Sequence, residues 1–275
     1  MNLCCPICRE SFISINGTTL VCKNGHSYDK SRDGYYNLLP PRRASVHGDN
    51  KEMIQARRAF LDTGAYLPLA RRIGALACES AVGDKVRLLD IGCGEGYYTR
   101  IVRDALTERG VQVSLCAFDI SKDAVRSCAR RVGTGEFAVA SAYHVPVQDG
   151  RFNIALNIFS PLAIEETHRV LAKDGIFIMA IPAAEHLFEL KRAVYDTPYK
   201  NEVQDTHLDG FELLSREELE YDIHLDTKEK IASLFKMTPY AYRTRREDAE
   251  KLYALDTLTV KASFILLVYK RKLWT

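Results

Sequence analysis

The chain has 275 residues, of which 47% are hydrophobic and 27% are charged, and its formal net charge is +2. This length accommodates one large domain and a small module, and the composition excludes a disordered or fibrous protein. No apolar run approaches the ~20 residues of a membrane span, and the N-terminus resembles neither a signal peptide nor a transit peptide. We therefore expect a cytoplasmic protein with no membrane segment.

Positive charge is concentrated near the start of the chain. The first 85 residues contain 12 Lys+Arg and 8 Asp+Glu, and they include the doublets Arg42–Arg43, Arg57–Arg58 and Arg71–Arg72. Such doublets suit a polyanionic partner. A solvated surface gives the same pattern, so the doublets alone leave both interpretations open.

The cysteines also cluster near the start, where four of the eight lie within the first 22 residues. A reducing cytoplasm disfavours disulfides, whereas zinc takes four sulfur or nitrogen ligands in a tetrahedron. We predict a zinc site formed by Cys5, Cys8, Cys22 and His26. Reduced, unliganded cysteines are the alternative, and Cys4 could replace Cys5. A full set of protein ligands makes this zinc structural rather than catalytic.

Residues 11–21, between the two ligand pairs, have the pattern of a β-hairpin. Apolar and polar residues alternate loosely, and Asn16-Gly17 stands at the centre. A hairpin would bring both ligand pairs together at its open end. We expect this module to occupy residues 1–37.

Residues 38–85 read as a linker followed by two helices. The first helix is predicted from about Lys51 to Asp62, with Asp49 or Asn50 as its N-cap. The second is predicted from about Leu67 to Ser80.

From residue 86 to residue 275, strand-like and helix-like segments alternate. This pattern predicts a doubly wound α/β fold with a mostly parallel sheet, that is, a Rossmann-like domain. The last apolar segment, 255–270, reads as one long strand or two, reached through the charged stretch 200–250, and we expect an antiparallel edge there. The earlier strands are predicted at 86–91, 112–118, 136–140, 152–159 and 176–181, and the helices at 97–108, 121–131, 163–171 and 185–195.

The loop after the first of these strands carries the main chemical signal. Gly92 and Gly94 allow a ligand to approach the backbone, and Asp90 and Glu95 place carboxylates beside them. Two carboxylates are unfavourable next to a pyrophosphate, which argues against a dinucleotide. They are compatible with S-adenosylmethionine, a sulfonium with no phosphate. Asp119 ends the next strand, from which it can accept hydrogen bonds from ribose hydroxyls.

These motifs give the chain two resemblances. Residues 86–275 resemble the class I methyltransferases that use S-adenosylmethionine, and the chain as a whole is similar to the bacterial 23S ribosomal RNA (guanine-N1) methyltransferases. The second resemblance rests on the Cys-Pro-Ile-Cys…Cys…His module and on the segments 34–40, 55–62, 90–99, 186–191 and 237–239. It implies methyl transfer from S-adenosylmethionine to N1 of a specific guanine in a hairpin loop of 23S rRNA, and a homodimer.

The resemblance also implies site residues. Tyr66 and His186 match family residues that contact the cofactor, and Gly94 and Glu95 match its loop contacts. From the sequence alone, Tyr66 would be an ordinary aromatic and His186 an ordinary helix residue.

The sequence gives fewer signals for the residues that would bind the methyl acceptor. Guanine N1 lies on the Watson–Crick edge and carries a proton, so the base must be unpaired or extruded and the proton must pass to a base or to water. The catalytic base is unknown from the sequence. Asn157 and Ser160 follow the fourth strand, where related enzymes face the acceptor, and they are candidates for contact with the guanine.

The zinc module would have a role in RNA docking. Its hairpin would present Arg9, Lys23, Tyr28, Lys30 and Arg32 to an RNA hairpin. Two alternatives remain from the sequence: a methyltransferase that acts on another RNA base or a small molecule, and a zinc-bearing RNA-binding scaffold with a vestigial cofactor site.

Overall fold

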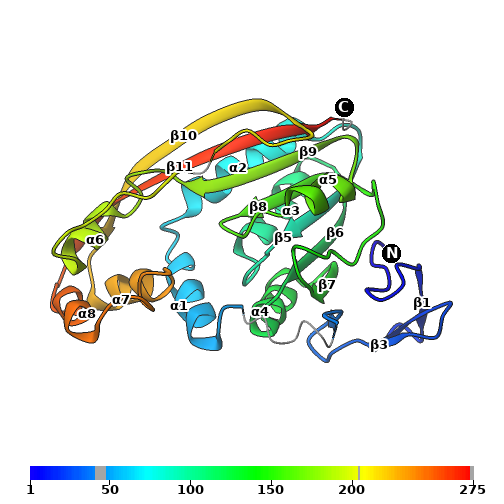
Figure 1. The fold of residues 1–275 in the computed structure, drawn as a ribbon, viewed down its shortest axis with the longest axis horizontal. Helices are drawn as coiled ribbons and strands as arrows, with labels where there is room; N and C mark the ends of the chain where they lie inside the picture. Colours follow the sequence, from blue (N-terminus) through cyan, green and yellow to red (C-terminus); the bar gives the residue numbers. More distant parts are fainter. Residues whose placement is uncertain (41–47, 204, 273–275) are drawn as a thin grey trace.

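A computed structural model describes residues 1–40, 48–203 and 205–272 (Figure 1). The predicted doublet Arg42–Arg43 lies outside the described residues. The structure has a three-stranded sheet near the N-terminus and a separate eight-stranded sheet. Among the described residues, no helix combines the length and the apolar character that a membrane crossing requires.

The predicted N-terminal hairpin is confirmed, and a third strand joins it. Strands β1 (Phe12–Ile15) and β2 (Thr19–Cys22) pair antiparallel, and β3 (Ser27–Asp29) pairs with β2. Asn16 and Gly17 both have positive φ, and the Thr18 N–H donates to the Ile15 carbonyl. These angles are those of a tight hairpin turn, which Asn-Gly favours.

The eight-stranded sheet has the order β10-β11-β9-β8-β5-β6-β7-β4. Strands β4 to β9 run parallel, and β11 is antiparallel to both β9 and β10. Neighbouring β5 residues Leu88 and Leu89 belong to different apolar clusters, so both faces of the sheet are buried. The strands are β4 (Tyr35–Asn37), β5 (Lys85–Ile91), β6 (Gln112–Asp119), β7 (Glu136–Val139), β8 (Phe152–Ile158), β9 (Leu171–Pro182), β10 (Phe211–Leu225) and β11 (Leu258–Arg271).

The helices agree closely with the predicted positions, and two further helices lie between residues 228 and 253. Asn50, rather than Asp49, caps the first helix: its side chain accepts a hydrogen bond from the Met53 N–H. The helices are α1 (Lys51–Leu61), α2 (Leu67–Ser80), α3 (Tyr97–Glu108), α4 (Lys122–Val132), α5 (Ile164–Val170), α6 (Phe188–Val194), α7 (Lys228–Lys236) and α8 (Arg246–Tyr253).

The C-terminal part contains the largest addition to the predicted fold. The final apolar segment forms one long strand, β11, and not two. It pairs with β10, a 15-residue strand from within the charged stretch. The antiparallel edge is confirmed. In Figure 1 the two long strands extend toward α6, α7 and α8, at the end of the molecule away from the zinc module.

Strand β4 links the N-terminal segment to the catalytic sheet. Tyr35 and Tyr36 are buried and pair parallel with Phe137 and Ala138 of β7. The last three residues of the predicted 1–37 module therefore form the edge of the large sheet. The predicted domain boundary between residues 37 and 38 stays a prediction. It lies at the start of the linker, whereas β4, just before it, packs with the large sheet.

Candidate functional site

The glycine loop follows β5, at the point where the strand order reverses. From β5 the chain forms β6 on one side and later β8 on the other, so the carboxyl ends of these strands border the opening where ligands bind in open α/β sheets. The Gly92 and Cys93 N–H groups both donate to the Phe118 carbonyl, at the end of β6. This arrangement holds the loop beside Asp119.

Three glycines shape the loop, and each has positive φ. A Cβ at Gly96 would lie 2.9 Å from Cα of Cys128 on α4, and a Cβ at Gly92 would overlap Ser160. A Cβ at Gly94 would meet only the tip of Arg57, at 3.6 Å. Gly92 and Gly96 therefore permit internal packing, whereas Gly94 keeps space clear in front of the loop, as a close-approaching cofactor requires.

The two predicted aspartates hold the loop by different contacts. Asp119 accepts hydrogen bonds from the Gly94 N–H (3.0 Å) and the Ser121 N–H (2.8 Å). Asp90 accepts from the Thr99 hydroxyl (2.5 Å). Burial raises the pKa of Asp119, although these two N–H groups oppose the shift, and burial raises the pKa of Asp90 to about 7. Asp119 thus orients the loop on which Gly94 lies, while Asp90 anchors the start of α3.

Glu95 is directed away from the open side of the loop. Its side chain is 1% exposed and forms an ion pair with Arg131 of α4 (2.7 Å). Burial raises the pKa of Glu95, and Arg131 opposes this shift. Arg131 also pairs with Asp62, which follows α1. Arg131 therefore ties the glycine loop and the end of α1 to α4, and the predicted cofactor contact of Glu95 stays a prediction.

Tyr66 and His186, 120 residues apart, lie together. The Tyr66 hydroxyl is 3.3 Å from His186 Nε2, and the Ser263 N–H donates to His186 Nδ1. Burial and the nearby Lys191 charge lower the pKa of His186 to about 3, so the ring is neutral. Because Nδ1 accepts, Nε2 carries the proton and donates to Tyr66. The hydroxyl proton of Tyr66 can then be donated to a ligand.

Asn157 and Ser160, the candidates for contact with the guanine, both form hydrogen bonds to backbone carbonyls within the chain. The Ser160 hydroxyl donates to the Ile91 carbonyl (2.6 Å), and the buried Asn157 amide donates to the Pro161 carbonyl (3.1 Å). The Ser160 bond holds the turn after β8 against the end of β5, directly before the glycine loop, and the Asn157 bond closes the turn itself. Phe159, between the two candidates, is 41% exposed and has a φ of 56°. Sequence reasoning did not single out Phe159.

The four predicted zinc ligands form one cluster. His26 Nδ1 lies 3.4, 3.5 and 3.3 Å from the sulfur atoms of Cys5, Cys8 and Cys22, and the Cys8 and Cys22 sulfurs are 3.7 Å apart. Zinc bonds of ~2.3 Å to sulfur and ~2.0 Å to nitrogen place tetrahedral ligand atoms about 3.5–3.8 Å apart. The cluster therefore fits zinc, and Cys4 is not part of it.

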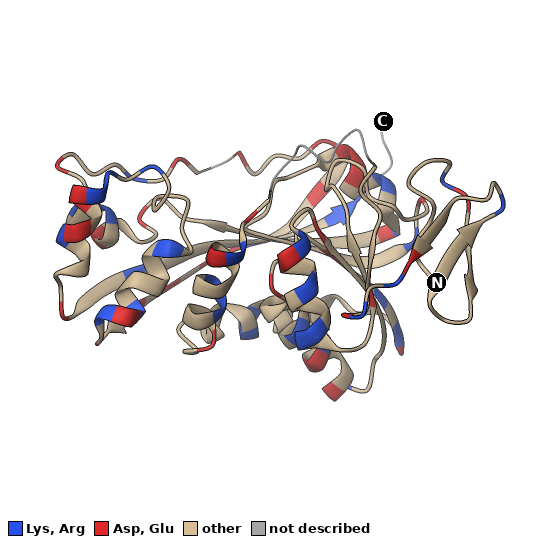
Figure 2. Ribbon diagram, turned by 90° about the horizontal axis from the view of Figure 1, so that it is seen from below, with Lys and Arg blue, Asp and Glu red and all other residues tan. Residues whose placement is uncertain are grey.

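Much of the predicted basic surface forms ion pairs within the chain. Three of the four described doublet arginines do so, and Arg9 and Lys23 of the zinc module are paired as well. Figure 2 shows blue and red segments interspersed along the helices. In the described part of the chain, no ion pair involves the exposed Lys30 or Arg32. The pairs are Arg57–Asp49, Arg58–Asp62, Arg72–Glu79, Arg72–Glu217, Arg9–Asp149 and Lys23–Glu10.

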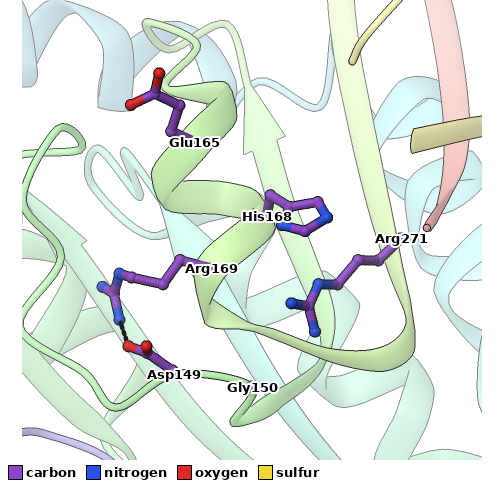
Figure 3. Close-up of a pocket in the computed structure, with 6 residues that line it drawn as sticks. All are labelled: Asp149, Gly150, Glu165, His168, Arg169 and Arg271. Atoms are coloured by element: carbon purple, nitrogen blue, oxygen red, sulfur yellow. Dashed lines mark hydrogen bonds and ion pairs between the residues drawn. The ribbon is translucent and has the colours of Figure 1, made fainter. Parts of the chain in front are cut away.

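A pocket of about 670 Å³ lies beside the amino ends of β8 and β9 (Figure 3). It is bordered by the segment before β8, by α5 and by the end of β11. Its charges are largely balanced, since Arg169 pairs with Asp149 and Glu166. The pocket is remote from the carboxyl ends of β5 and β8, so it is separate from the glycine-loop site. Its lining residues are Asp149, Gly150, Glu165, His168, Arg169 and Arg271.

Comparison with known proteins assigns the chain to a family. A family model described as "Methyltransferase domain" matches residues 83–237, and one described as "RlmA, N-terminal", a zinc ribbon, matches residues 3–44. A protein of Micromonospora griseorubida, named among the 23S rRNA (guanine-N(1)-)-methyltransferases, is 31% identical over 98% of this chain and 97% of its own length. The chain belongs to the 23S rRNA (guanine-N1) methyltransferases.

Two further relatives have names in the same family. The 23S rRNA (guanine(748)-N(1))-methyltransferase of Streptomyces fradiae is 36% identical over 69% of this chain and 66% of its own length. A Bacillus subtilis protein named for the same guanine-N1 activity is 28% identical over 96% of this chain and 95% of its own. As a methyltransferase of this family, the chain is an enzyme with S-adenosylmethionine as cofactor and a structural zinc in its ribbon.

Proposed function

We propose that this enzyme transfers a methyl group from S-adenosylmethionine to N1 of one guanine in a hairpin loop of 23S rRNA. The observation that carries the proposal is the contact between Ser160, in the turn after β8, and Gly92 of the glycine loop. Because of this contact, the glycine loop and the turn after β8 border the same opening of the sheet, which supports a cofactor beside the loop and an acceptor base beside the turn. The names of the relatives indicate guanine as the methylated base and N1 as the methylated atom.

The geometry of three residues supports a way in which the chain would position the cofactor. Asp119 is placed to accept hydrogen bonds from ribose hydroxyls, Gly94 leaves room for the cofactor, and Tyr66 can donate its hydroxyl proton. S-adenosylmethionine supplies a methyl group on a good leaving group, so alignment of the acceptor can remove much of the barrier. The guanine must be held unpaired, with its N1 proton free to leave.

Methylation of unmodified RNA tests the proposal. The purified enzyme and labelled S-adenosylmethionine would be incubated with 23S rRNA from a strain that lacks the activity. We expect one N1-methylguanine, located by mass spectrometry of RNA fragments within a hairpin loop. Label on another base, or turnover of small molecules alone, would refute the assignment.

A matched pair of variants tests the cofactor site. Asp119→Asn should weaken S-adenosylhomocysteine binding by about 10- to 100-fold, because a hydrogen bond to a charged acceptor is lost. Asp123→Asn, on the first turn of α4 and paired with Arg126, should bind normally. Calorimetry with both variants measures this difference, and equal affinities would remove Asp119 from the site.

For the zinc module, we propose that it docks the RNA hairpin through Lys30 and Arg32. Deleting residues 1–37 is an unsuitable test because it removes β4 from the large sheet. Lys30→Glu with Arg32→Glu should instead weaken RNA binding and reduce its salt dependence, with zinc content unchanged. Lys85→Glu, at the exposed start of β5, is the control. RNA binding unchanged by the double substitution would contradict the docking role.

We further propose that the enzyme is a cytoplasmic homodimer, as the family resemblance implies. Light scattering on the purified protein gives the oligomeric state directly. A monomer at micromolar concentration would exclude a stable dimer.

A further inference from the structure

Phe159 stands out in the turn after β8 because its backbone and its exposure are both unusual. Its φ of 56° lies in the left-handed region, which bulky residues rarely adopt, and such residues concentrate at functional sites. The Phe159 N–H bonds to the Ala180 carbonyl, and the next residue, Ser160, is fixed to Ile91. The turn is therefore held on both sides of Phe159, while the side chain is 41% exposed.

The Phe159 ring belongs to the rim of the proposed methyl-transfer site. Its centroid lies 6.1 Å from that of Tyr98, which follows the glycine loop, and 5.6 Å from that of Phe264. Phe264 in turn contacts the rings of Tyr66 (5.2 Å) and His186 (4.7 Å). Phe159 thus joins the cofactor loop to the Tyr66–His186 pair, and part of its ring remains open to solvent.

The chemistry of this surface suits a flat aromatic ligand. The rings of Tyr98 and Phe264 pack against Phe159, so ordering it on binding costs little conformational entropy. The neighbouring Asn157 and Ser160 side chains have local hydrogen-bond partners. The exposed group between them is an aromatic ring, and an unpaired base binds well to such a ring by stacking.

We propose that Phe159 is the stacking platform for the target guanine, holding the extruded base beside the glycine loop. This inference rests on the proposed function and deepens it by naming the residue that receives the base. Stacking tolerates any base, so Phe159 would set the position of the acceptor rather than its identity.

Two variants that lack the ring test this role in the full-length enzyme. Phe159→Leu keeps an apolar side chain. Phe159→Gly relieves the positive φ but removes the ring contacts with Tyr98 and Phe264, so thermal unfolding beside the wild type checks that each variant is folded. Both should lose about 10- to 100-fold in kcat/KM for unmodified 23S rRNA, the range expected for one stacked base. Both should bind S-adenosylhomocysteine within twofold of the wild type.

Conservative replacements and a control complete the experiment. Phe159→Tyr and Phe159→Trp keep a stacking surface and should stay within threefold of wild-type kcat/KM. Leu214→Ala removes an exposed apolar side chain from β10, at the far edge of the sheet, and should have no effect.

The outcomes separate this inference from the proposed function. Near-normal kcat/KM of Phe159→Gly with an active wild type would overturn the stacking role alone. A parallel fall in S-adenosylhomocysteine affinity would also overturn it, because Phe159 would then be a wall of the cofactor pocket. A wild-type enzyme that fails to methylate 23S rRNA would refute the proposed function itself.

Discussion

The Tyr66–His186 pair depends on a neutral imidazole in one tautomer. The Ser263 backbone N–H selects that tautomer by donating to Nδ1, and the Ser263 hydroxyl bonds in turn to Glu220 of β10. A protonated His186 would direct a second N–H at the Ser263 N–H, and two donors cannot bond to each other. The pair is therefore sensitive to acid.

We predict that His186 makes the protein less stable below neutral pH. Its pKa of about 3 in the folded protein lies below the ordinary value of 6.5, so its stabilising effect is complete above pH 6.5 and is lost as the pH falls toward 3. Between pH 7.5 and 5.0 the wild type should lose about 2 kcal/mol more unfolding free energy than His186→Gln. Urea unfolding of both proteins at the two pH values measures this, and parallel losses would contradict it.

Sequence reasoning found some of these residues and missed others for identifiable reasons. Asp90 and Asp119 lie at the carboxyl ends of β5 and β6, and the glycines follow β5, so their positions could be predicted from strand order. Tyr66 and His186 came only from the family resemblance, since nothing local predicts a contact across 120 residues. Phe159 was missed because its exposure and positive φ arise only when the turn is held against β9 and β5.

At the scale of elements, the glycine loop and α4 pack too closely for side chains between them. The close approach of Cys128 to Gly96 contrasts with the open space at Gly94, although both have positive φ. Two glycines in one loop thus differ: Gly96 is required by packing, whereas we propose that Gly94 leaves room for the cofactor.

Alanine substitutions should separate these functions. Gly96→Ala should cost about 3 kcal/mol of unfolding free energy, from the left-handed backbone and the overlap with Cys128. Gly94→Ala should cost about 1 kcal/mol but should weaken S-adenosylhomocysteine binding severely, because its methyl group would occupy the ligand side. Urea unfolding and calorimetry test the pair, and equal unfolding free energies would disprove the distinction.

Besides the short β3 of the ribbon, two strands of the large sheet escaped prediction at this scale. β10 is rich in charge because one of its faces is exposed, so its alternating pattern was hidden among glutamates. β4 has only three residues, and it is stabilised by its pairing with β7 rather than by its own propensity. Both depend on partners distant in sequence, whereas the central parallel strands are marked by their own apolar residues.

At the scale of the whole molecule, we expect bound zinc to stabilise part of the catalytic domain as well as the ribbon. The metal cluster holds the chain from which β4 emerges, and Asn2 bonds to Ser114 and Glu136 of the catalytic domain. Release of the metal would therefore loosen both the pairing of β4 with β7 and the hydrogen bonds of Asn2.

We predict that Cys22→Ser lowers the zinc content well below one per chain and lowers the melting temperature. Hydrogen exchange should increase in β7 as well as in the ribbon, because β4 would no longer protect that edge. Cys78→Ser, outside the cluster, should keep one zinc and the wild-type exchange pattern. Unchanged protection of β7 in zinc-free protein would show that β4 is held independently of the metal.

The pairing of β4 with β7 also has a consequence for biosynthesis. The ribosome completes β4 roughly a hundred residues before β7, an interval of about 5–20 s at usual rates of elongation. The ribbon can close on its metal in that time because all four ligands precede residue 27. A metal-bound ribbon would then carry β4 as a tethered strand until its partner leaves the exit tunnel. The supply of zinc during translation would thereby influence how often the edge of the catalytic sheet is completed.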